Sequence, residues 1–269
     1  MQRSPQTTPG PRGRERRSRL RCGALTAAAL VTVCLGATRA EVSWRDIETR
    51  IQYGYYTEDA SALRSLEDTV AADESQDKLH GYYAALLAWR LAQLAAQRPS
   101  AAPGASAAQL AQRCVSELDE ALAVAADFAE GLALRAACLA TPRDANGSQS
   151  SRAAHRARRD VGRALQLAAR NPRVLLVDAM NDYQLAPELG GNKERALVKL
   201  RQAVAAFELE RTGAERLPGW GAAEVYLLLA RDLLDHGETV AARDALERAL
   251  LLAPEFTQAR RLMAQIISG

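Results

Sequence analysis

The chain has 269 residues, of which 48% are hydrophobic and only 5% aromatic, so it is long enough to bury a core as one or two domains. Alanine and leucine dominate, which favours close-packed helices over strands. The net charge of +3 does not indicate nucleic-acid binding, because the basic excess lies in the first 40 residues.

Residues 1–40 have the layout of a secretory signal peptide. Seven arginines precede an apolar, uncharged stretch at 23–36, and small residues follow it. Fourteen apolar residues are too few for a comfortable membrane span. We expect cleavage after Ala40 and export to the periplasm or medium of a bacterium, with an uncleaved anchor as the alternative. Cleavage removes eight of the 35 Lys+Arg and one of the 32 Asp+Glu, which leaves a net charge of −4.

The remaining residues, 41–269, are predicted to form a single all-α domain of repeated helix pairs. The second helix of successive pairs carries an apolar triplet at spacings of four and three. The four triplets are Cys114/Leu118/Ala121, Ala157/Val161/Ala164, Ala196/Leu200/Ala203 and Ala242/Leu246/Ala249. The expected repeat units are 43–75, 76–126, 127–170, 171–211 and 222–255, with a capping helix at 256–268. Segments rich in Pro, Gly, Ser or Ala are expected to be loops at 97–107, 141–151 and 210–221.

Two cysteines, Cys114 and Cys138, remain after removal of the N-terminal segment, in a compartment that permits disulfides. The turn between their helices is expected near residue 126, so each cysteine lies 12 residues from it. In an antiparallel helix pair both are then about 18 Å from the turn. This equal depth permits a disulfide if the side chains face each other. The alternative is two small buried residues at tight helix contacts.

Four arginines, Arg152, Arg156, Arg159 and Arg163, are spaced four, three and four residues apart. This spacing places them on one face of a predicted helix, and the apolar triplet of that helix points roughly the other way. One interpretation is a docking face for an acidic partner or for anionic lipid. The other is a solvated outer face with no binding role.

The segment PELGGNK, residues 187–193, places a glycine pair and a lysine before a helix. A phosphate loop requires G-x-x-x-x-G-K followed by Ser or Thr, after a strand. Here the spacing is wrong and no hydroxyl follows Lys193. We therefore expect a turn in which the glycines end one helix and Asn192 caps the next.

The last unit carries the fullest repeat pattern. Counted from Ala223, nine residues fall at positions 4, 7, 8, 11, 15, 20, 24, 27 and 32 of a repeat, and these are Tyr226, Leu229, Ala230, Leu233, Gly237, Ala242, Leu246, Ala249 and Pro254. This pattern resembles that of the tetratricopeptide repeat (TPR) family. The segment from Pro187 to Lys193 and the pair Trp220-Gly221 are similar to those of a group of exported bacterial repeat proteins. The resemblance covers about residues 43–269 and implies a right-handed α-solenoid that binds proteins or peptides.

In the TPR family the first helix of each repeat lines a concave groove. The resemblance implies groove residues at Arg173, Leu176, Met180 and Tyr183 and, in the last unit, at Glu224, Leu227, Arg231 and Asp235. Mixed charges and apolar anchors suit capture of a protein or peptide. The alternative is a groove filled by the protein's own loops or terminal helix.

The predicted function is therefore a non-enzymatic binding scaffold of the bacterial cell envelope. A self-associating structural subunit and an accessory component of an envelope transport or assembly complex are the alternatives. His80, His155 and His236 stand in separate units without the spacing of a zinc site, and no G-x-S-x-G elbow occurs. We predict no catalytic residues, no metal and no cofactor.

Overall fold

A computed structural model describes residues 43–73, 77–97, 105–141, 150–211 and 217–268. Every regular element within these ranges is helical, and the predicted all-α fold is confirmed. The helices are α1 (Trp44–Tyr56), α2 (Ala60–Ala71), α3 (Lys78–Gln97), α4 (Ala107–Val124), α5 (Ala129–Ala140), α6 (Ser151–Leu167), α7 (Pro172–Gln184), η1 (Pro187–Leu189), α8 (Lys193–Arg211), α9 (Ala222–Asp235), α10 (Thr239–Leu252) and α11 (Thr257–Ser268). The predicted signal peptide and parts of the three expected loops lie outside the described residues.

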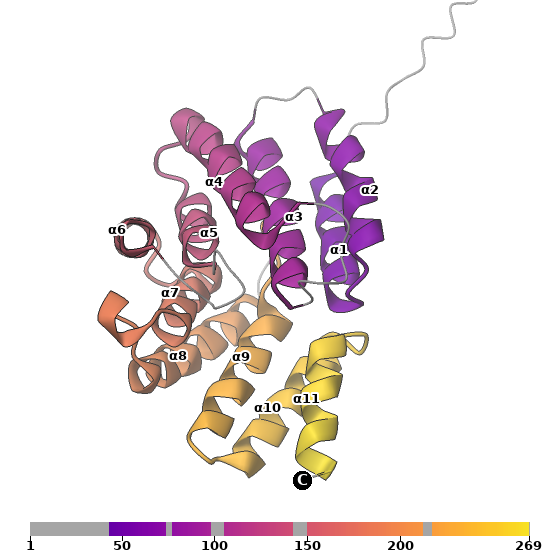
Figure 1. The fold of residues 1–269 in the computed structure, drawn as a ribbon, viewed down its shortest axis with the longest axis vertical. Helices are drawn as coiled ribbons and strands as arrows, with labels where there is room; N and C mark the ends of the chain where they lie inside the picture. Colours follow the sequence, from indigo (N-terminus) through magenta and orange to yellow (C-terminus); the bar gives the residue numbers. More distant parts are fainter. Residues whose placement is uncertain (1–42, 74–76, 98–104, 142–149, 212–216, 269) are drawn as a thin grey trace, which may run out of the picture. The chain divides into compact units, whose positions relative to one another are not determined.

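Successive helices pack side by side in antiparallel pairs (Figure 1). The most extensive contacts join α3 to α4, α5 to α6, α7 to α8 and α9 to α10. Contacts between α4 and α5, α6 and α7, and α8 and α9 join each pair to the next. This stacking is a TPR-like α-solenoid, and α11 packs on α10 at its C-terminal end. Among the described helices, none has both the length and the apolar character needed to cross a membrane.

The four apolar triplets lie at the interfaces of the helix pairs, and all of their side chains are buried. Their alanines allow paired backbones to approach closely, and the larger side chains fill the space between the helices. Leu200, for example, is fully buried, so its truncation to alanine is expected to cost about 2–5 kcal/mol. The repeat period of the sequence therefore specifies the packing of neighbouring helices.

Short polar side chains fix where several helices begin. Oxygens of Ser43, Asp59, Ser150 and Asn171 accept hydrogen bonds from backbone N–H groups in the first turn of α1, α2, α6 and α7. Ser106 and Gln109 form a reciprocal capping box at the start of α4. Each such cap satisfies backbone donors that the helix itself leaves unpaired.

The glycine pair before α8 forms a tight turn. Gly190 has a φ of 92°, a left-handed conformation that favours glycine. A Cβ atom on Gly191 would lie 1.7 Å from the backbone oxygen of Leu185, so no larger residue fits there. Asn192 Oδ1 accepts a hydrogen bond of 2.7 Å from the backbone N–H of Arg195. Both glycines and the cap are thus accounted for by the turn itself.

Helices α4 and α5 are cross-linked by a disulfide between Cys114 and Cys138. Their Cα atoms lie 6.2 Å apart, within the roughly 4.4–6.8 Å of ordinary disulfides. Both side chains are buried. The cross-link therefore ties the second helix of one repeat to the first helix of the next.

Candidate interaction site

The inner surface of the solenoid is occupied by the protein's own side chains. Glu224 on α9 accepts hydrogen bonds of 2.8 Å from Gln52 Nε2 and from the Tyr56 hydroxyl, both on α1. It also forms an ion pair with Arg90 on α3. Tyr56 further contacts Phe256, with ring centroids 4.5 Å apart. Helix α1 thus packs against the last repeat.

Arg90 is the most buried charged side chain of this closure, at 1% exposure. Its guanidinium lies over the rings of Tyr55, Trp89 and Trp220, at 4.0, 4.7 and 5.0 Å from the centroids. Such contacts stabilise a cation removed from water. With the carboxylate of Glu224 as its counter-ion, Arg90 is both paired and enclosed, which is what a buried charge requires.

A second buried carboxylate anchors the segment before α9. Glu48 accepts hydrogen bonds from the backbone N–H of Gly219 at 2.8 and 2.9 Å and from the Tyr83 hydroxyl at 2.8 Å. Burial raises the pKa of Glu48, and these two donors oppose the rise. Trp220 Nε1 donates to the Tyr82 hydroxyl at 2.7 Å. The segment preceding α9 is therefore fastened to α1 and α3.

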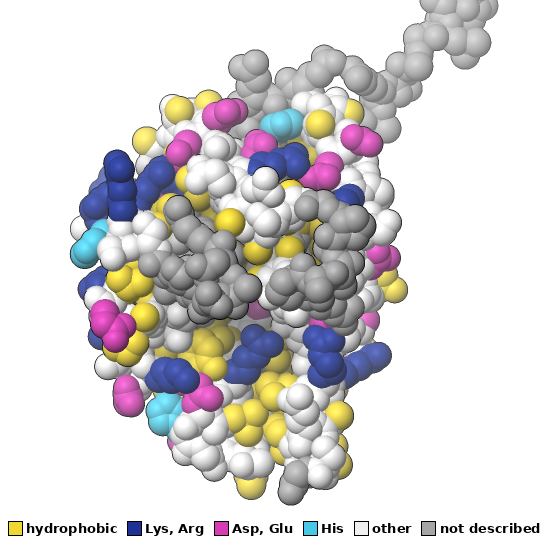
Figure 2. Space-filling view, viewed as in Figure 1, with side chains coloured by type: hydrophobic (Ala, Val, Ile, Leu, Met, Phe, Trp, Pro, Cys, Tyr) yellow, Lys and Arg dark blue, Asp and Glu magenta, His cyan; other side chains and the backbone are white. Residues whose placement is uncertain are grey.

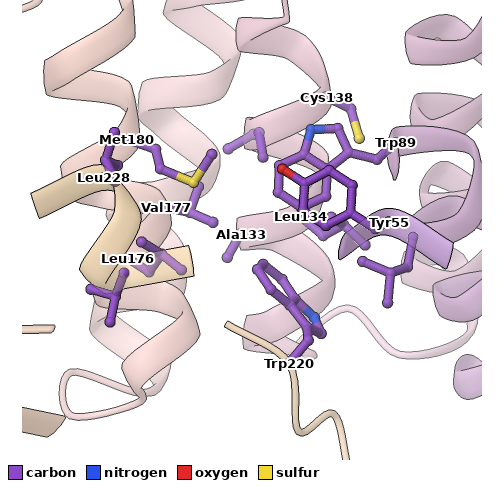
Figure 3. Close-up of a cluster of buried hydrophobic side chains, with 14 of the residues drawn as sticks. Tyr55, Trp89, Ala133, Leu134, Cys138, Leu176, Val177, Met180, Trp220 and Leu228 are labelled. Carbon is purple, nitrogen blue, oxygen red and sulfur yellow. The ribbon is translucent and has the colours of Figure 1, made fainter. Parts of the chain in front are cut away.

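The expected groove residues of the unit at 171–211 are also enclosed. Leu176 and Met180 are buried, and Figure 3 shows them in one cluster with Trp89 and Trp220. Leu227 of the last repeat is buried too. In this structure the expected open groove is closed, because aromatic side chains of α1, α3 and the segment before α9 fill its apolar interior.

The remaining polar groove residues have partners within the chain. Asp235 accepts a hydrogen bond of 3.0 Å from the Tyr183 hydroxyl and one of 2.6 Å from Lys193 Nζ. These donors outweigh desolvation and lower the pKa of Asp235. Arg231 donates to Gln258 Oε1 at 2.9 Å. Asp235 and Arg231 are thus already engaged within the chain.

A cavity of about 1100 Å³ opens at the edge of the α7–α8 helix pair. Its walls are the α6–α7 turn, the first turn of α7 and the C-terminal half of α8, and it is lined mainly by alanine, leucine and proline side chains. We call it the α7–α8 cavity. The apolar lining residues are Ala168, Ala169, Pro172, Leu175, Ala205, Ala206, Leu209, Leu217 and Pro218.

Two paired charges stand in this cavity. Arg173 is buried and donates two hydrogen bonds, of 2.8 and 2.9 Å, to the carboxylate of Glu210. Desolvation alone would lower the pKa of Arg173, but the hydrogen bonds and charge of Glu210 outweigh it and raise the pKa. Glu130 accepts from Asn171 Nδ2 at 2.6 Å. Arg170 is exposed at the rim, so beside its apolar lining the cavity carries the Arg173–Glu210 pair, the carboxylate of Glu130 and the cation of Arg170.

The predicted basic stripe lies on the outer side of α6. Three of its members, Arg152, Arg156 and Arg159, line a second cavity of about 790 Å³ with His155. The fourth, Arg163, is not among the residues lining that cavity and donates to Gln166 Oε1 at 3.4 Å. The structure thus brings three of the four arginines to one concave surface.

The histidines remain apart in the fold. His80 Nδ1 lies 3.3 Å from Asp73 Oδ2, and His236 Nδ1 lies 2.7 Å from the backbone oxygen of Asp232. Within the described ranges, no three or more His, Cys, Asp or Glu side chains gather where they could hold a metal ion.

Sequence reasoning missed Arg90 and the α7–α8 cavity. A signal for Arg90 was present, because it stands alone in the apolar segment ALLAWRLAQL, where a charge needs a buried partner. The cavity had no such signal, since it arises where three separate segments meet. Its position could not be found from helix periodicity.

No protein-family model and no curated protein sequence matches this chain. Among solved structures, the HusA haemophore from Porphyromonas gingivalis aligns over 72% of this chain and 94% of its own, with a TM-score of 0.54 and 19% identity. A thermophilic TPR protein from Thermus thermophilus aligns over 84% of this chain and 100% of its own, with a TM-score of 0.54 and 16% identity. These similarities confirm the TPR-like fold, and a fold alone assigns no ligand.

Proposed function

We propose that the chain is a non-enzymatic interaction module, exported to the bacterial envelope, that holds a protein or peptide partner. The TPR-like fold indicates a protein–protein interaction scaffold. The signal-peptide layout of residues 1–40 supports export. The α7–α8 cavity is the observation that carries the proposal, because it is an open apolar surface in a solenoid whose inner surface is already occupied.

The size and lining of the cavity favour a chain segment over a small molecule. Its volume of about 1100 Å³ is above the roughly 300–1,000 Å³ typical of small-molecule pockets. Its apolar lining suits side chains such as leucine or phenylalanine, which anchor peptide segments in grooves. The charge of the buried Arg173 is already paired with Glu210, so a ligand does not have to neutralise it.

Site-specific photo-crosslinking in intact cells tests this proposal. Leu209 lines the cavity and is 75% exposed, and Leu251 on α10 is also 75% exposed but lies outside the cavity. A photoreactive residue at Leu209 should yield a covalent adduct with one envelope protein. The same residue at Leu251 should not, and equal adducts at both positions would reject the cavity as the site.

The identity of the adduct separates the proposal from its alternative. An adduct of twice the chain's own mass would identify a second copy, and the self-associating subunit would then be the correct function. Light scattering of the purified protein provides the independent check, since a monomer at tens of micromolar contradicts self-association. Export is checked by N-terminal sequencing of the envelope form, which should begin at Glu41.

A further inference from the structure

The outer side of α6 carries a concentrated positive charge. Figure 2 shows Lys and Arg side chains gathered on the left edge of the molecule, over α6. The cavity of about 790 Å³ beneath them is lined by Gln112, Val115, Leu139, Ser150, Arg152, Ala153, His155, Arg156 and Arg159. We call it the α6 cavity. Among the described residues, its lining has three arginines and no acidic side chain.

Two of these arginines are available to a ligand. Arg152 and Arg159 are exposed and have no hydrogen-bond or ion-pair partner among the described residues. Arg156 instead pairs with Asp119, which also accepts from Arg135. The α6 cavity therefore holds two unpaired cations beside one that is already neutralised.

Helix polarity adds to this charge. Ser150 caps the start of α6, and Arg152 follows in the first turn. The N-terminus of a helix has a partial positive charge that favours anions. The arginines and the helix N-terminus therefore both make the electrostatic potential of the cavity positive. A complementary occupant must supply carboxylates or similar anionic groups.

The floor of the α6 cavity is apolar. Val115 of α4, Leu139 of α5 and Ala153 of α6 lie among its lining residues. A segment that fits it would thus combine acidic side chains for the rim with apolar side chains for the floor. Guanidinium groups bind carboxylates with two parallel hydrogen bonds, which gives such a rim geometric selectivity.

We infer that the α6 cavity docks an acidic, partly apolar segment of a protein partner. The inference rests on the proposed function as an interaction module and adds a second contact surface to it. A protein segment is favoured over a lipid surface because the basic site is concave. The large exposed apolar residues that would insert into a bilayer lie elsewhere, and the α6 cavity is lined by none of them.

Fluorescence anisotropy with a defined probe tests the inference. The probe is a labelled ten-residue peptide of alternating glutamate and leucine, and the control peptide has glutamine in place of glutamate. The full chain is compared with Arg152→Glu/Arg159→Glu and with the matched pair Arg243→Glu/Arg248→Glu on α10. All four arginines are exposed and both variants change the net charge equally, so general charge effects are the same.

We expect the acidic peptide to bind at least tenfold more weakly to the α6 variant and within twofold of wild type to the α10 variant. Binding should weaken as salt rises from 50 to 300 mM, because exposed charges are screened. The glutamine peptide should not bind. Mass mapping of a photoreactive probe peptide should place the adduct on α4, α5 or the first half of α6.

Equal weakening in both variants, or none in either, would overturn the inference. The inference would also be overturned if phosphatidylglycerol vesicles bound through the same arginines and the peptide failed to displace them, because the surface would then recognise lipid. Circular dichroism checks the fold of each variant. If the α6 variant misfolds, Arg152→Gln/Arg159→Gln takes its place, and its affinity for the acidic peptide is expected to be about threefold weaker than that of wild type. If the wild-type chain fails to bind the acidic peptide while the Leu209 adduct forms, only this inference is rejected. If the peptide binds at α6 but no Leu209 adduct forms, only the α7–α8 cavity is rejected.

Discussion

Arginines occur both on the inner surface and around the α6 cavity, but their surroundings differ in the two regions. Arg90 is buried, ion-paired to Glu224 and enclosed by three aromatic rings. Arg152 and Arg159 are exposed beside an apolar floor and have no partner among the described residues. Arginines with different burial thus have different roles: Arg90 joins α3 to α9 inside the solenoid, and Arg152 and Arg159 are available for binding.

The largest expected effect comes from breaking the closure. Glu224→Ala leaves Arg90 as a buried charge without its counter-ion, which typically costs about 3–5 kcal/mol. Glu67→Ala is the matched control, because it removes the partner of Arg113, which is 47% exposed, and such pairs contribute about 0.2–1 kcal/mol. Urea denaturation measures both. Equal losses would mean that Arg90 is not the closing residue.

The disulfide has the next largest expected effect. Cys114 and Cys138 are 24 residues apart, and a cross-link that closes a loop of this length stabilises a protein by about 3 kcal/mol. Cys114→Ala/Cys138→Ala should lower the free energy of unfolding by this amount. Reductant should lower the stability of wild type to the same level and leave the variant unchanged. If reductant also lowered the stability of the variant, the effect of reduction would not come from the Cys114–Cys138 bond.

Two carboxylates, Glu48 on the inner surface and Asp182 on α7, should respond to pH in opposite directions. Burial raises the pKa of Glu48 on the inner surface, so the folded state binds its proton more tightly than the unfolded state. The contribution of Glu48 to stability is therefore greatest at low pH and is lost as pH rises from its ordinary value of 4.5 toward the raised one. Asp182, by contrast, receives hydrogen bonds from Arg195 and a salt bridge from Lys199.

These partners outweigh desolvation and lower the pKa of Asp182 below its ordinary value of 3.8. Its contribution is present above that pH and is lost as pH falls through the lowered pKa. The free energy of unfolding should be measured from pH 3 to 8. Glu48→Gln should reduce the fall in this free energy as pH rises, and Asp182→Asn should reduce its fall at acid pH. A change of the same sign in both variants would contradict this assignment.

The smallest effect is expected at Arg163. It belongs to the basic stripe by spacing but is not among the residues lining the α6 cavity. Arg163→Ala should change the free energy of unfolding by less than about 0.5 kcal/mol, as exposed substitutions usually do. It should also leave the affinity for the acidic peptide unchanged. A clear loss of peptide affinity would extend the binding surface toward the end of α6.

Local pattern predicted much of this fold, because it concerns neighbouring helices. The triplets, the Asn192 cap and the shared face of Arg152 and Arg159 all depend on periods of three to four residues. Closure of the inner surface depends instead on contacts such as that of Gln52 with Glu224, 172 residues apart in the chain. Small rotations between successive repeats add up to bring these residues together, and no local pattern encodes that sum.

The same dependence on distant contacts explains why apolar residues predicted to line the groove are buried. Residues such as Leu176 and Leu227 occupy the helix positions that the repeat pattern assigns to the groove. Whether they contact solvent or other side chains depends on how far the solenoid closes. Their apolar character, expected to anchor a peptide, contributes to the protein's own interior.

Hydrogen exchange with and without the acidic peptide can show whether the inner surface is structural and binding takes place on the outside. Amides of α1 and α9 should exchange slowly and at unchanged rates, whereas saturating peptide should slow exchange in the first half of α6. Peptide-induced changes in α1 and α9 with none in α6 would show that the solenoid opens to bind, and would contradict the account.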